Sequence, residues 1–196
     1  MKKKIAVLIL ISVFALQALP VSPACAAPAA RRIALLPVAA TAPAREFPGV
    51  EAKIAATLAA WFRTPLPSFV KTYEIIPADQ IETALRPDGA LNPRKPDLQR
   101  LRQLAAQLDA DLVLGVIVTD LSEHLGRNQE GDIILRTDLA MRLVGYRADR
   151  DSLIDIKDRE DYFDSWSAGG EAANLAGVLT ERLLTKAAGG REFWPR

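Results

Sequence analysis

The residues best suited to chemistry lie in the second half of the chain. His124 is the only histidine and stands beside Glu123 in a polar stretch. A general base needs a reacting partner within hydrogen-bond reach, and no motif around His124 supplies one. We therefore interpret His124 as a loop residue in solvent. Because Cys25 is the only cysteine, a zinc site of ordinary ligand type is not expected either.

Five carboxylates within ten positions form the densest acidic cluster. They could supply the oxygen ligands that Ca²⁺ prefers. The glycine-containing calcium loop is absent, however, and the alternation of a strand would divide the carboxylates between two faces. We favour a solvated edge strand whose charges deter pairing with other sheets; a hydrolytic site using Asp158 and Glu160 is a weaker alternative. The cluster consists of Asp155, Asp158, Glu160, Asp161 and Asp164.

Arg136, Asp138 and Arg142 project from one side of a predicted strand next to the acidic one. Cross-strand ion pairs worth roughly 0.2–1 kcal/mol each are the default interpretation. The alternative is a charged docking surface for a partner protein.

Phe193 and Trp194, in the terminal six residues, either fold back onto the domain or serve as aromatic anchors in a partner's groove.

Glycine and serine patterns supply no catalytic motif. Gly169 and Gly170 precede a predicted helix, but the lysine and hydroxyl positions of a phosphate-binding loop are missing. No nucleophile elbow is present. We expect no enzymatic activity, no metal and no cofactor.

The elements that must position these residues follow from the spacing of apolar side chains. Continuous or alternating runs predict strands, and apolar residues three and four apart predict helices. Asp97 is placed to cap a helix, whereas 86–96 and 123–131 are predicted loops. Trp61 and Phe62 share a helix face and are assigned to the core. The predicted strands are 32–38, 69–76, 110–119, 133–143 and 153–166, and the predicted helices begin at Val50, Asp79, Asp97 and Ala172.

The predicted order is β-α-β-α-α-β-β-β-α. This is a single domain of the α/β (α+β) class, with a mixed sheet, a carboxyl-terminal antiparallel meander and helices packed on the sheet. Without an internal cysteine, a domain of about 170 residues must be stabilised by its packed core, and it is large enough for that.

Three segments resemble a group of bacterial envelope domains. They are the opening run 33–38, the helix-to-strand passage 104–115 and the hairpin segment 139–146. The group includes the amino-terminal domain of TolB, the curli secretion protein CsgG and the peptidoglycan-synthase activator LpoB. The resemblance implies an accessory domain, periplasmic or associated with the outer membrane, that works by protein–protein contact, and it carries over no catalytic residue. The chain lacks the long inserts of a CsgG pore and the propeller repeats of TolB.

The first 26 residues have the pattern of a secretory signal peptide. Three lysines precede an apolar run that is too short to span a membrane, and a small-residue exit follows. Ala24 and Ala26 fit signal-peptidase cleavage before Ala27. The alternative makes Cys25 the lipidated first residue of an outer-membrane lipoprotein, although Pro23 departs from the usual motif.

The charge of the exported chain excludes two classes of partner. Loss of Lys2, Lys3 and Lys4 with the leader changes the formal charge from +1 to −2. Nucleic-acid binding draws on a basic excess that is missing, and no basic segment suits anionic lipid. Membrane attachment would come only through Cys25.

We therefore predict a leader at 1–26, a short mature segment at 27–30, one domain at 31–190 and an aromatic tail at 191–196. The expected function is a periplasmic, non-enzymatic accessory or assembly factor that binds an envelope protein. A periplasmic domain that binds a small ligand or lipid is the alternative.

The intact mass of the mature chain distinguishes the two cleavage sites. We expect a chain that begins at Ala27 and has lost Cys25. Retention of Cys25 with the added mass of a diacylglycerol would contradict this prediction and establish the lipoprotein.

Overall fold

The computed structural model describes residues 30–41, 43–63, 73–86, 92 and 97–188. The predicted leader, with Ala24, Cys25, Ala26 and Ala27, lies outside the described residues. So do most of the predicted loop 86–96 and the whole tail with Phe193 and Trp194.

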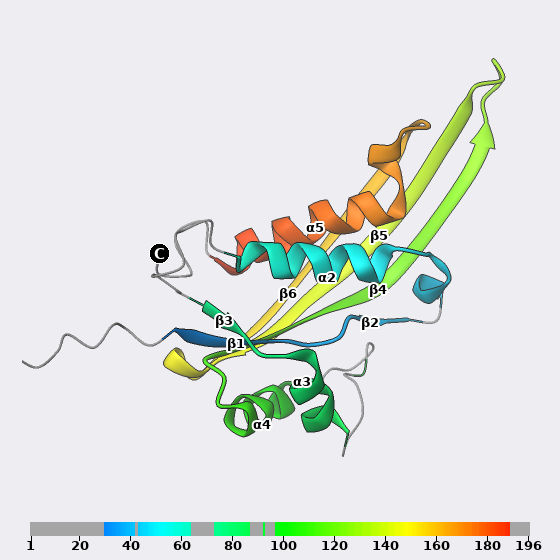
Figure 1. Cartoon of the computed structure of the whole chain (residues 1–196). Helices are drawn as coiled ribbons and strands as arrows, with labels where there is room; N and C mark the ends of the chain where they lie inside the picture. The colour runs from blue at the N-terminus through cyan, green and yellow to red at the C-terminus, as the bar shows by residue number, and fades with distance from the viewer. Residues whose placement is uncertain (1–29, 42, 64–72, 87–91, 93–96, 189–196) are drawn as a thin grey trace, which may run out of the picture.

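One mixed sheet forms the centre of the domain (Figure 1). Its strand order is β3-β1-β4-β5-β6, with the short β2 paired to β4. β1 runs parallel to both β3 and β4, while β4, β5 and β6 form an antiparallel meander. This confirms the predicted fold class and places β6 at an edge. The strands are β1 Arg31–Leu35, β2 Ala39–Ala40, β3 Tyr73–Ile75, β4 Leu112–Arg127, β5 Ile133–Arg147 and β6 Ser152–Ser165.

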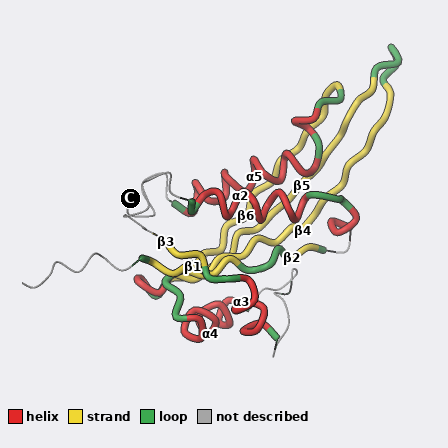
Figure 2. Tube along the Cα trace, viewed as in Figure 1, coloured by secondary structure: helices red, strands yellow, loops and turns green. Residues whose placement is uncertain are grey.

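Helices pack on both faces of the sheet, but they cover unequal lengths of it. α2 and α5 lie along one face, and α3 and α4 cover only one end of the other (Figures 1 and 2). The α-helices are α2 Val50–Trp61, α3 Ala78–Leu85, α4 Leu98–Leu108 and α5 Ala172–Ala187, and the 3₁₀ turns are η1 Pro43–Glu46, η2 Ala148–Arg150 and η3 Ala168–Gly170.

The first half of β4 separates two hydrophobic cores. Leu114 and Val116 face α2 and α5, whereas Val113 and Ile117 face α3 and α4. All four side chains are fully buried. This explains the continuous apolar run in the sequence, since a strand covered on both faces has no wet side.

Beyond Val118 the meander continues past α3 and α4. A β-bulge between Val118 and Asp120 ends the doubly covered part of β4, and the β4–β5 hairpin then projects from the body (Figure 1). The prediction of a loop over 123–131 was wrong, because β4 extends to Arg127. His124 is therefore a strand residue paired with Arg136. Both faces of this projection meet solvent, so its polar sequence resembles that of a loop.

Two further predictions need correction. Trp61 is 38% exposed, whereas its neighbour Phe62 is 3% exposed and packs edge-on against Tyr73. Successive helical residues point about 100° apart, so only one of the two can face the core. The second predicted strand, 69–76, is a strand only over Tyr73–Ile75 among its described residues. The sequence did not indicate β2, because a strand of two residues is too short to show a period of two.

Side chains cap two helices, one from the adjacent residue in the sequence and one from a distant strand. Asp97 accepts hydrogen bonds from the amides of Gln99 and Arg100, which confirms the predicted cap. The amide of Ala172 at the start of α5 donates to Glu123 on β4 over 2.7 Å. A carboxylate at this end of a helix also interacts favourably with the helix dipole. The projecting hairpin is thereby attached to α5.

Two strand glycines form a matched pair for testing the packing. A Cβ atom on Gly145 would lie 2.6 Å from the Val113 carbonyl oxygen, whereas one on Gly126 would meet nothing within 4 Å. We expect Gly145→Ala to lower the free energy of unfolding by about 1–3 kcal/mol. Gly126→Ala should change it by less than about 0.5 kcal/mol. Urea unfolding measures both, and equal effects would contradict the packing described here.

Candidate functional site

The surface that stands out is the uncovered side of β5 and β6, which we call the open face. It points away from α2 and α5 and lies beyond the reach of α3 and α4 (Figure 1). None of the described helices covers it. Its residues come from alternate positions on the two strands: Arg136, Asp138, Ala140 and Arg142 on β5, and Asp155, Lys157, Arg159, Asp161 and Phe163 on β6.

The alternation along β5 explains why these side chains share one face. Leu139 and Met141 are buried in one core with α2 and α5, and Leu135 is buried on the same side of the strand, so the residues between them must point the other way. Arg136, Asp138 and Arg142 are thus brought to one side of the strand, as the sequence predicts.

Arg142 makes the best-formed ion pair of the open face. Its Nε and one Nη each donate to an oxygen of Asp155 on β6, both over 2.6 Å. This bidentate geometry is the strongest kind of arginine–carboxylate contact. The predicted pairing of Arg142 with the acidic strand is confirmed.

A second group of charges connects the two strands farther along. Arg136 Nε donates to Asp138 over 3.2 Å, and the other oxygen of Asp138 accepts from Arg159 over 3.2 Å. Arg159 also donates to Asp161 over 2.8 Å. The predicted cross-strand pairing holds for Asp138, whereas Arg136 pairs along its own strand. Pairs this exposed contribute little to stability, and their alternating charges give the surface a specific pattern.

The ion pairs lower the pKa values of two aspartates. The hydrogen bonds from Arg142 lower the pKa of Asp155 against an opposing effect of partial desolvation. Desolvation raises the pKa of Asp138, but its contacts with Asp161, Arg136 and Arg159 outweigh this, and the net shift is downward. Both carboxylates are therefore fully charged at neutral pH.

Asp158 and Glu160, the two carboxylates considered for hydrolysis, point to the opposite side of the sheet, toward α5. Lys186 Nζ lies 2.7 Å from Asp158, and Arg182 lies 2.5 Å from Glu160. The acidic cluster is thus divided between two faces, as the strand period predicts. In the described part of the chain, no group of three or more metal-binding side chains could hold an ion.

Phe163 is a functional candidate that the sequence interpretation missed. It lies opposite Arg136 on the open face and is 75% exposed. Phe163 falls at an odd-numbered position of β6, as do the charged residues Lys157, Arg159 and Asp161, and this period of two would have indicated that its side chain is exposed. A large aromatic ring left in solvent is typical of a binding surface.

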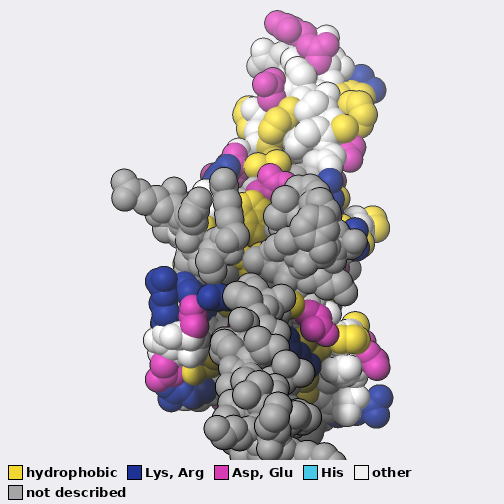
Figure 3. Space-filling view, turned by 60° about the vertical axis from the view of Figure 1, so that its left-hand side comes forward, with side chains coloured by type: hydrophobic (Ala, Val, Ile, Leu, Met, Phe, Trp, Pro, Cys, Tyr) yellow, Lys and Arg dark blue, Asp and Glu magenta, His cyan; other side chains and the backbone are white. Residues whose placement is uncertain are grey.

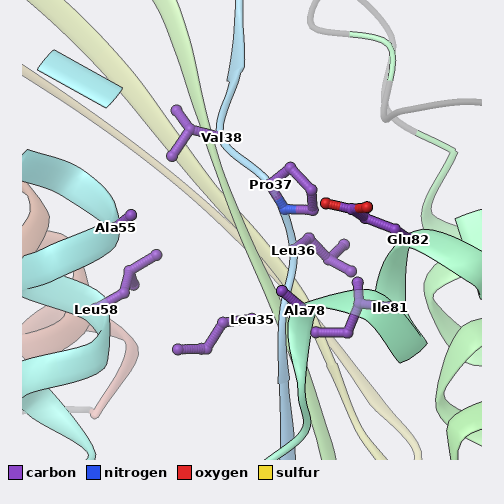
Figure 4. A pocket seen from close by; sticks show the side chains of 9 residues that line it. All are labelled: Leu35, Leu36, Pro37, Val38, Ala55, Leu58, Ala78, Ile81 and Glu82. Carbon is purple, nitrogen blue, oxygen red and sulfur yellow. The ribbon is translucent and has the colours of Figure 1, made fainter. Parts of the chain in front are cut away.

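Two cavities test the alternative of a small ligand. One of about 150 Å³ lies beside β1, between α2 and α3 (Figure 4). Leu36, Leu58 and Ile81 contribute to its apolar wall, and Glu82 is its charged residue. A cavity of this size holds a benzene-sized group, whereas ligand pockets usually measure about 300–1,000 Å³.

The second cavity, of about 430 Å³, is large enough but polar. Its charged residues are already engaged: Arg32 pairs with Asp109, and the Arg32 amide donates to Asp111. Arg102 pairs with Asp151 and lies over the ring of Tyr146.

Comparisons with known proteins find solved structures that match this one at low identity and with TM-scores below 0.5. Lipoprotein GNA1162 from Neisseria meningitidis is 16% identical with a TM-score of 0.43, covering 81% of this chain and 99% of that one. The hypothetical protein CT253 from Chlamydia trachomatis is 13% identical with a TM-score of 0.41, covering 83% and 95%. A PelC dodecamer structure from Paraburkholderia phytofirmans is 14% identical with a TM-score of 0.39, and the match covers 80% of this chain and 87% of that one.

These likenesses assign neither a family nor a function to the chain. Bacterial lipoproteins are among the similar structures, and the more specific resemblance to TolB, CsgG and LpoB stays a prediction. No known protein family and no curated protein matches the sequence. Among the described residues, no helix is both long and apolar enough to cross a membrane.

Removal of the Arg142 guanidinium should raise the pKa of Asp155. In Arg142→Gln we expect this pKa to return toward its ordinary value of about 3.9. A lowered pKa stabilises the fold above the ordinary value, and this contribution is lost as the pH falls through the folded-state pKa. The melting temperature of the variant should therefore fall less than that of the parent on acidification below about pH 4. Titration of the carboxyl carbons by NMR measures the shift.

Arg136→Gln is the matched control for this titration. It removes a guanidinium from the same strand and should raise the pKa of Asp138 while leaving that of Asp155 in place. Equal movement of Asp155 in both variants would contradict the assigned pairing.

Proposed function

We propose that this chain is an exported, non-enzymatic envelope protein that binds another protein through the open face. The observation that carries the proposal is a charge-patterned sheet surface that also holds the exposed ring of Phe163. The leader pattern in the first 26 residues supports export.

The composition of the open face favours a protein partner. Its cations, Arg136, Arg142, Lys157 and Arg159, are interspersed with aspartates rather than gathered into a basic stripe. A polyanion or an anionic membrane would be attracted to an excess of positive charge. A mixed surface around an aromatic side chain instead resembles the polar rim and anchor of a protein interface.

The described geometry also supports a role without catalysis. Asp158 and Glu160, the carboxylates considered for hydrolysis, are engaged by Lys186 and Arg182 of α5. His124 lies on β4 next to Arg136 in the sheet, and among the described residues no nucleophile is in hydrogen-bond contact with it. The polar cavity lined by Arg32 and Arg102 is the surface that a small-ligand function would use.

Position-specific photocrosslinking in living cells tests the proposed surface. We expect p-benzoylphenylalanine at Phe163 or at Arg136 to give one covalent adduct of the same mass. The same probe at Glu51 on α2 or Glu181 on α5, both exposed on the helical side, should not give that adduct. An adduct formed only from the helical positions, or equally from all four, would contradict the proposal.

A further inference from the structure

The projecting part of the meander has two edges, and they differ in how their backbone groups are satisfied. On β6, the Arg159 amide donates a hydrogen bond to the carboxylate of the preceding Asp158 over 3.0 Å. Asp164 likewise accepts from the Ser165 amide over 2.7 Å. These aspartates occupy outward donors of the edge strand, which reduces its capacity to pair with another strand.

The other edge, the end of β4, has no such protection. β2 pairs with β4 only at Ile117 and Val118, and η1 contacts β4 as well. The Asn128 amide donates to Asp132 on the β5 side. Because an antiparallel ladder alternates, the even-numbered residues bond to β5 and the odd-numbered ones direct their backbone groups outward. Glu123, Leu125 and Arg127 form this free edge, and no hydrogen bond from a described residue reaches their outward amides.

Apolar side chains accompany the free edge. Leu125 is 64% exposed, and Ile133 on the neighbouring strand is 48% exposed. Figure 3 shows hydrophobic side chains on the projecting end of the molecule and acidic side chains at its tip. Charged groups at the tip oppose insertion into a membrane, whereas apolar side chains beside an unpaired edge favour addition of a strand.

The free edge is complementary to itself. Glu123 and Arg127 lie two residues on either side of Leu125, and all three side chains share one face of the sheet. If two copies pair antiparallel about Leu125, each Glu123 stands opposite the other copy's Arg127. The three outward residues then form three hydrogen-bonded pairs across the two-fold axis.

The intervening positions also fit this register. His124 of one copy meets Gly126 of the other at the closely spaced, non-hydrogen-bonded position. A Cβ atom at Gly126 has nothing within 4 Å, so the space for an imidazole is open there. The two Leu125 side chains meet on the axis next to Ile133.

We infer that this chain forms a symmetric dimer through β4, with the edge 123–127 of one copy paired antiparallel to the same edge of a second copy. The product is a continuous sheet of two meanders with both open faces on the same side. Five residues a side make a small contact beside the roughly 1,600 Å² of a standard interface. The dimer is accordingly weak, and its exposed Glu–Arg pairs make it sensitive to salt.

Sedimentation velocity over a range of concentrations tests this dimer, using the chain that begins at Ala27, which contains no cysteine and therefore forms no disulfide. We expect one monomer–dimer equilibrium that shifts toward monomer at high salt. Arg127→Glu places two glutamates opposite each other and should raise the dissociation constant about tenfold. Lys157→Glu, an equal charge change on β6 away from this edge, should leave it unchanged.

A charge exchange makes the test specific to the register. Glu123→Arg combined with Arg127→Glu restores opposite charges across the axis and should recover the dimer. Because Glu123 also caps α5, the melting temperature of this double variant is compared with that of the parent. Leu125→Pro serves as a second test of the same edge. Leu125 donates no amide to β5, so proline there should abolish the dimer and preserve the fold.

Crosslinking locates the axis independently. In the chain that begins at Ala27, Leu125→Cys should oxidise to a disulfide-linked dimer, whereas Leu153→Cys, exposed on β6, should not. A monomer at all concentrations, assemblies larger than a dimer, or equal weakening by Arg127→Glu and Lys157→Glu would overturn the inference.

Discussion

The unequal covering of the two sheet faces is the constraint on which the rest of the structure depends. α2 and α5 extend along one face, so every second residue of β5 from Leu135 to Leu143 is buried. α3 and α4 protect the other face only around Val113, Ile117, Val144 and Tyr146. Beyond that point the strands keep their pairing without a helical layer, and their outward side chains must be polar and mutually satisfied. The Arg142–Asp155 pair and the group around Asp138 meet this demand.

The same constraint explains where the molecule can meet partners. A strand surface held in place by a buried opposite face presents its charges with little conformational freedom, which favours recognition over raw affinity. The edges follow a second rule, because unpaired backbone groups attract other strands. On β6 the aspartates 158 and 164 occupy some of these groups, whereas Glu123, Leu125 and Arg127 leave those of β4 available. The open face and the free edge are therefore separate surfaces with different physical origins.

Most of the fold could be predicted from apolar spacing, and the failures share a cause. Buried elements such as β1 and the first half of β4 were evident because burial enforces a pattern on the residues. The projecting half of β4 was mistaken for a loop, since solvent on both sides removes the alternation that marks a strand. Arg136, Asp138 and Arg142 could be assigned to one face from the period of two, but their partners depend on the register with β6. The role of Glu123 as a cap of α5 does not follow from local sequence, because it is set by a tertiary contact, whereas the exposed side of Phe163 follows from the period of β6.

The central claim is that the charges of the open face serve recognition and not only stability. The exchange Arg142→Asp with Asp155→Arg tests it most directly, because it keeps an ion pair between the same two strands while reversing its direction. We predict that the free energy of unfolding stays within about 1 kcal/mol of the parent, while the adduct obtained from a photoreactive group at Phe163 is lost. Retention of that adduct at the parental level would contradict the account.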